Sequence, residues 1–125
     1  MRGNKYIRKA KEFFEFAKKE IEKSKRNDKQ HLAVDGCEKA WLAPVLATKG
    51  LFVKKGIKKE KELPKNFRGL LYFLHKYGTK EMEKTLGYLR TMLHSEGFYN
   101  QHINYKLIET SFEELEVYIK TIEKI

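Results

Sequence analysis

The stretch HSEGFYNQH, residues 94–102, places two histidines, a glutamate and a tyrosine close together. Imidazole and carboxylate groups are the side chains that most often transfer protons or bind metal ions. Arg90 lies four residues before His94. On a helix this spacing puts both side chains on one face, where they could contact one phosphate. These residues are therefore the first candidates for a reactive site.

The same stretch is also typical of the end of a helix, and we prefer this interpretation. Leu93 continues an apolar stripe, and Gly97 can adopt the left-handed conformation that ends a helix. His94 then lies near a helix C-terminus, where the helix dipole favours a protonated imidazole. Phe98 and Tyr99 are expected to fold back onto the protein.

A metal site is a weaker alternative. His94, Glu96 and His102 carry suitable ligand atoms, but their spacing matches no metal-binding signature. Gly87 and Gly97 stand alone, so there is no glycine-rich loop that could cradle a phosphate. We therefore expect neither a metal nor another cofactor.

Apolar residues recur at helical spacing in five segments, without an alternating strand pattern. The expected helices span about residues 5–26, Lys29 to about Phe52, Pro64 to Tyr77, Thr79 to about Ser95, and a last helix from Asn104 or Ser111. Pro44 lies within the second helix, where a kink or a break is expected. Gly78 is expected to stop the third helix, and Thr79 to cap the fourth. Short connections then predict one all-α domain, an antiparallel bundle over residues 1–125.

Two side chains of the second helix are expected to be buried. Trp41 lies on the apolar stripe, although an exposed ring that stacks on bases is an alternative. Cys37 lies on the same stripe and is interpreted as a small buried hydrophobe rather than a nucleophile. A single cysteine fits a reducing compartment, and the charged start of the chain lacks a signal peptide. We therefore expect a cytoplasmic protein without a membrane span.

The formal charge of +10 is unevenly placed, and the segment VKKGIKKEKELPKNFR, residues 53–68, holds seven Lys or Arg against two Glu. A field of one sign attracts anionic partners such as RNA or nucleotides. The expected binding residues are Lys54, Lys55, Lys58, Lys59, Lys61, Lys65 and Arg68. The alternative is that these lysines only solubilise the surface. Abundant Lys and Glu are also typical of thermophiles.

Two motifs resemble those of the HEPN superfamily, especially its archaeal PaREP1-like branch. The first is Glu38, Lys39, Ala40 and Trp41 in the alanine-rich second helix. The second is Leu93-His94 followed by Phe98-Tyr99, although Glu96-Gly97 lengthens the turn between them. The resemblance covers nearly the whole chain. It implies a HEPN-like bundle that commonly pairs as a homodimer.

Active HEPN ribonucleases carry an arginine and a histidine separated by four to six residues. Their arginine stabilises phosphate charge, and their histidine acts in acid–base chemistry at the 2′-hydroxyl. Arg90 and His94 have three residues between them, one short of the pattern. Arg68 and His75 have six, but they lie on the preceding helix.

We therefore expect a binding protein for RNA or nucleotides that has no catalytic activity. One alternative is a metal-independent endoribonuclease that uses Arg90 and His94. The other is a structural partner in a toxin–antitoxin-type complex, with a small nucleotidyltransferase as its partner.

A symmetric homodimer is predicted from the aromatic residues that fall outside the main apolar stripes. These residues are Phe16, Tyr72, Phe73 and Tyr88. Exposed apolar surface of this kind is often covered by a second copy of the chain.

Overall fold

A computed structural model describes residues 2–57 and 59–125, with side chains from residue 5 onward. The elements are α1 (Arg2–Asn27), α2 (Gln30–Lys54), the 3₁₀-helix η1 (Glu60–Glu62), α3 (Phe67–Tyr77), α4 (Lys80–Leu89), the π-helix η2 (Arg90–Tyr99) and α5 (Tyr105–Glu123). The described residues contain no strand, so the expected all-α bundle is confirmed. Within the same residues, no helix combines the length and apolarity that a membrane crossing requires.

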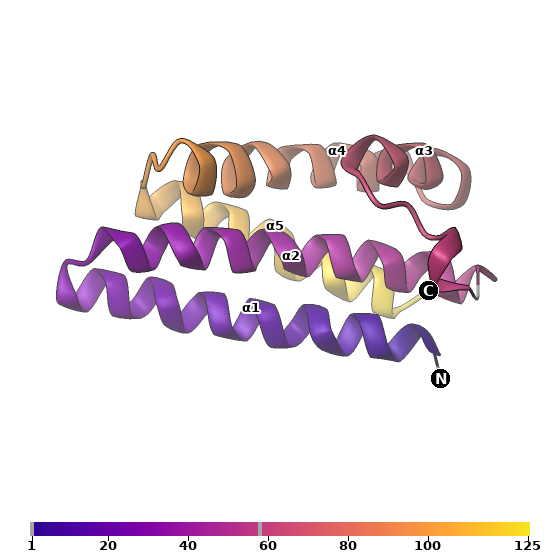
Figure 1. Ribbon diagram of the computed structural model, residues 1–125, viewed down its shortest axis with the longest axis horizontal. Helices are drawn as coiled ribbons and strands as arrows, with labels where there is room; N and C mark the ends of the chain where they lie inside the picture. Colours follow the sequence, from indigo (N-terminus) through magenta and orange to yellow (C-terminus); the bar gives the residue numbers. More distant parts are fainter. Residues whose placement is uncertain (1, 58) are drawn as a thin grey trace.

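α1 and α2 form a long antiparallel hairpin (Figure 1). α1 buries one stripe, in which residues alternate three and four positions apart: Ile7, Ala10, Phe14, Ala17, Ile21 and Ser24. The turn uses Asp28 at a φ of 52°, a conformation that short polar side chains tolerate. At the turn, the Ser24 hydroxyl lies 2.9 Å from the Lys29 carbonyl and 2.5 Å from the Tyr105 hydroxyl of α5.

α2 is the central helix, and α1, α3, α4, η2 and α5 all contact it. It runs unbroken through Pro44, so of the expected kink or break, the break is wrong. The missing backbone hydrogen bond is tolerated because packing on several sides holds this helix in place. The Pro44 carbonyl accepts a hydrogen bond of 2.7 Å from Thr48. The hydroxyl of Tyr118 in α5 lies 2.5 Å from the same Thr48 oxygen.

α3 and α4 begin at polar capping residues. The Asn66 side chain accepts a hydrogen bond from the Gly69 amide at 2.8 Å and caps α3. Pro64 therefore lies before the helix, which begins three residues later than predicted, at Phe67. Gly78 follows the last residue of α3, and Thr79 caps α4 through the Met82 amide, as predicted.

The fourth helix extends past its predicted end near Ser95. α4 continues directly into η2, which ends at Tyr99, and the Asn100 amide bonds to the Ser95 carbonyl at 2.8 Å. This bond spans five residues, the pattern of a π-helix. Asn104 then caps α5 through the Leu107 amide. The last helix therefore begins at Tyr105, the earlier of the two predicted starts.

The helices form an antiparallel bundle with α2 at its centre (Figure 1). α1 lies along one side of α2, α3 and the continuous α4–η2 helix lie on the opposite side, and α5 packs behind. The start of α1 and the end of α5 meet at one end of the bundle, and the α1–α2 turn lies at the other.

Ion pairs join α1 to α5 at both ends of their contact. Lys11 pairs with Glu123, and Lys25 lies 2.5 Å from Glu109. The lysines are fourteen residues apart on α1, and so are the glutamates on α5. Because the helices are antiparallel, one register satisfies both pairs.

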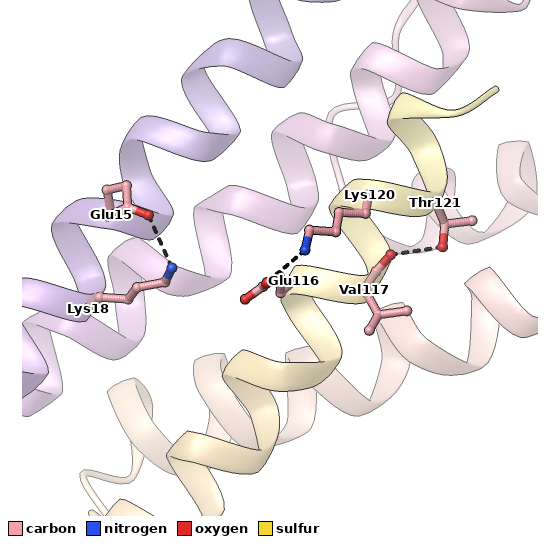
Figure 2. A network of polar contacts seen from close by, with 6 residues as sticks. All are labelled: Glu15, Lys18, Glu116, Val117, Lys120 and Thr121. Atoms are coloured by element: carbon pink, nitrogen blue, oxygen red, sulfur yellow. Dashed lines mark hydrogen bonds and ion pairs between the residues drawn. The ribbon is translucent and has the colours of Figure 1, made fainter.

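Lys18 lies midway between the two lysines on α1, and Glu116 lies midway between the two glutamates on α5, each seven residues from its neighbours. Here each side chain bonds within its own helix: Lys18 to Glu15 at 3.1 Å, and Glu116 to Lys120 at 3.0 Å (Figure 2). The pKa of Glu116 is lowered first by the hydrogen bond and charge of Lys120, and further by the charge of Lys18. The middle pair therefore interacts across the groove without direct contact.

Candidate nucleic-acid interface and the Arg90–His94 cluster

Arg90 and His94 belong to one row of neighbouring groups, the aromatic row, contributed by α2, α3 and η2. The Arg90 guanidinium lies 4.5 Å from the centre of the Phe67 ring. Phe67 lies 6.1 Å from Trp41, Trp41 6.0 Å from His94, and His94 6.1 Å from Phe98, all between ring centres. The structure thus brings both candidate residues to one cluster of aromatic side chains.

The two ends of this row differ in access to solvent. Arg90 is exposed, whereas the His94 ring is half-buried between Trp41 and Phe98. The Nδ1 atom of His94 is buried and has no hydrogen-bond partner among the described residues. Any contact between His94 and a phosphate or a 2′-hydroxyl must therefore use Nε2.

The predicted helix end around His94 requires correction. Gly97 lies inside η2 and does not adopt a positive φ, so the expected left-handed stop is wrong. The left-handed residue is Gln101, at a φ of 56°. Gly97 is instead buried against α2, where an added Cβ would lie 2.6 Å from the Cys37 sulfur. A glycine is needed here because η2 approaches α2 closely, a requirement that depends on a residue sixty positions away.

The second arginine–histidine pair is not assembled into a cluster. Arg68 and His75 are both exposed, and their spacing puts them roughly 10 Å apart along α3. His75 faces α4, where its Nδ1 lies 3.6 Å from a Glu83 oxygen.

The metal alternative fails on geometry. Glu96 accepts a hydrogen bond of 2.9 Å from Asn100 and lies 3.2 Å from His102, while His94 packs against Trp41 instead. These two hydrogen bonds, His102 first, lower the pKa of Glu96. Within residues 5–57 and 59–125, no three His, Cys, Asp or Glu side chains are grouped so that they could hold a metal ion.

The cations of the predicted binding segment differ in what they contact. Lys54 donates hydrogen bonds to the Ile122 and Glu123 carbonyls, at 3.1 and 3.0 Å. A cation at the carboxyl end of α5 is stabilised by the helix dipole, so Lys54 has a structural role. Lys58 lies outside the described residues. The remaining five side chains are exposed: Lys55, Lys59, Lys61, Lys65 and Arg68.

The other two candidates of the second helix are core residues. Trp41 is only 8% exposed, so the alternative of a free stacking platform is wrong. Cys37 is fully buried, and burial raises the pKa of its thiol to about 12. A thiol with this pKa is protonated at neutral pH, which agrees with its interpretation as a buried hydrophobe.

Sequence reasoning did not identify Phe67 as the partner of Arg90. Both residues occur on predicted helices, but periodicity does not tell which helices touch. No family model, no curated protein and no solved structure matches this chain. The function of this chain is therefore inferred from its own residues and their geometry.

Proposed function

We propose that this protein is an RNA-associated HEPN-like protein that binds through its exposed basic segment, without catalysis. The observation that carries the proposal is a run of exposed cations from the end of α2 to the first turn of α3, namely Lys55, Lys59, Lys61, Lys65 and Arg68. The resemblance of the sequence motifs to HEPN proteins supports the choice of RNA.

The basic segment continues toward the aromatic row. Arg68 follows Phe67 directly in the chain, and the Arg90 guanidinium lies over the Phe67 ring. Both arginines are exposed. An anion bound at the start of α3 also benefits from the positive end of the helix dipole. These features favour a polyanion that follows the segment toward Arg90.

The proposal is tested by reversing the charge of Lys55, Lys59 and Lys65 together. Binding of labelled RNA is measured by fluorescence anisotropy at several salt concentrations. We expect weaker binding and a salt-dependence slope smaller by up to about 2, because each lost phosphate contact on a single strand removes about 0.7. Circular dichroism should show unchanged helix content.

The matched control reverses three exposed lysines of the α5 side, Lys106, Lys120 and Lys124. This variant has the same change in net charge. An equal loss of affinity in both variants would mean that only overall charge matters, and would refute binding by the segment.

A second candidate function is metal-independent cleavage of RNA, favoured by the shared aromatic row of Arg90 and His94. The 2′-hydroxyl would lose its proton and attack the adjacent phosphorus, and the bond from phosphorus to the 5′-oxygen would break. The products would be a 2′,3′-cyclic phosphate and a protonated 5′-hydroxyl. The test incubates purified protein with total RNA, with and without EDTA. Cleavage that resists EDTA and is lost in both Arg90→Ala and His94→Ala, but not in Arg68→Ala, would establish this function in place of simple binding.

A further inference from the structure

The outer face of α3 presents an aromatic ring between two cations. Tyr72 is 69% exposed, the second most exposed of the large apolar and aromatic side chains in the described residues. Arg68 lies four residues before it and Lys76 four residues after it, and both are exposed. This spacing places all three on one row of the helix, about 12 Å long.

The Tyr72 ring lies beside another ring that packs on the core. Its neighbour Phe73 lies 6.2 Å away between ring centres, and Phe73 packs against the fully buried Phe52 at 5.3 Å. α3 itself is held to the bundle by the buried Leu70 and Leu74. An exposed ring on a fixed support loses little conformational freedom when it binds a flat partner.

Tyr99 offers a comparison within the same chain. It is 77% exposed, but no lysine or arginine lies three or four residues away on its helix or in the following loop. The nearest charged residue at such spacing is Glu96. Three aromatic side chains of the described residues are exposed, namely Phe16, Tyr72 and Tyr99. Only Tyr72 has a lysine or arginine three or four residues away both before and after it.

We propose that Tyr72 is a stacking platform for an unpaired base of single-stranded RNA, with Arg68 and Lys76 contacting the phosphates on either side. This inference rests on the proposed RNA association and specifies its ligand. Every base has a face that can stack on an aromatic ring, so the contact is largely independent of sequence. In a duplex the bases stack on each other, and their faces are not available to Tyr72.

The test compares Tyr72→Ala, Tyr72→Phe and the control Tyr99→Ala with the wild type. Affinity is measured by anisotropy for a short labelled single strand of RNA and for the corresponding duplex. We expect Tyr72→Ala to weaken single-strand binding by about tenfold or more, because one stacked base contributes a factor of this order. Tyr72→Phe should restore binding to within a few-fold, and Tyr99→Ala should not change it.

The outcomes separate this inference from the function on which it rests. If the wild type binds neither the single strand nor the duplex, both the RNA association and the stacking platform are refuted. Wild type that binds RNA, with Tyr72→Ala unchanged or equally weakened on single strand and duplex, refutes the platform but leaves RNA association standing. A fall in mass of Tyr72→Ala by light scattering would assign the ring to a subunit interface and would also refute the platform.

Discussion

Replacement of Gly97 by alanine tests the close contact between η2 and α2. The added methyl group would lie 2.6 Å from the Cys37 sulfur, 2.8 Å from the Cys37 Cβ and 3.2 Å from the Met92 carbonyl oxygen. Overpacking in a core costs about 1–3 kcal/mol. Alanine in a helix is favoured over glycine by roughly 0.5–1 kcal/mol. We therefore expect Gly97→Ala to lower the free energy of unfolding by about 1–2 kcal/mol.

Gly87 provides the matched control, ten residues earlier on the same continuous helix. An added Cβ there meets no atom of the described residues within 4 Å, apart from the nearby backbone of its own helix. Gly87→Ala should therefore stabilise the protein by roughly 0.5–1 kcal/mol. The two substitutions are chemically identical, but they are expected to change the free energy of unfolding in opposite directions.

Urea unfolding followed by circular dichroism measures both free energies, and an unchanged m-value verifies that the transitions are comparable. Repeating Gly97→Ala in a Cys37→Ala background removes the sulfur but leaves the Cβ contact of 2.8 Å. The penalty should then shrink without vanishing, as expected for residues in contact. A stabilising Gly97→Ala, similar to Gly87→Ala, would refute the close approach of the two helices.

Further predictions concern a buried pair of hydroxyls, the Glu96 carboxylate, the Cys37 thiol and the oligomeric state. Thr48→Val should cost about 1–3 kcal/mol, more than the roughly 1 kcal/mol of Tyr118→Phe, because only the former leaves a buried hydroxyl unpaired; thermal unfolding distinguishes them. The lowered pKa of Glu96 stabilises the folded state above the unfolded pKa of 4.5, and this stabilisation is lost as the pH falls through the lower folded value. Glu96→Gln should therefore flatten the acid limb of the stability curve, and an unchanged limb would exclude a contribution from this pair. Cys37 should resist a thiol reagent at about pH 8 until the protein unfolds, because burial raises the pKa of its thiol to about 12. Light scattering at about 100 µM should give the mass of a homodimer, because an interface of ordinary size binds more tightly than this.

The homodimer prediction now depends on fewer residues than the sequence suggested. Phe73 and Tyr88 are partly buried and pack against the core. Phe16 remains 45% exposed and is available to a second copy of the chain, whereas the 69% exposed Tyr72 is assigned above to RNA. Periodicity could not separate these cases, because a side chain at the margin of an apolar stripe can point either into the core or into solvent.

Local rules predicted the parts of the fold that depend on neighbouring residues. Thr79 was predicted to cap α4 because its side chain can reach the amide three residues ahead, a relation visible in the sequence. Asn104 caps α5 in the same way, at one of the two predicted starts. Pro44 does not break α2, and Gly97 does not adopt the expected left-handed conformation, both for the opposite reason. Their conformations depend on packing against other helices, which overrides the local preference of each residue.

The candidate site shows the same division. The spacing of Arg90 and His94 correctly placed them on one helix, but the burial of His94 depends on Trp41 of α2 and could not be deduced from spacing. Lys54 looked like any other lysine of its segment. Only the folded chain shows that its ammonium group binds the end of α5.

The repeated spacing of lysines on α1 and glutamates on α5 has a consequence for alignment. If α1 slid by one heptad, Lys18 would face Glu123 and Lys25 would face Glu116, so two of three charge matches would survive. The charges are therefore degenerate: they favour antiparallel neighbours without selecting a single alignment. Selection comes from the closed end of the hairpin, where Ser24 meets Tyr105 and a short turn links α1 to α2. A loosened turn would thus permit misaligned bundles whose surface charges still look satisfied.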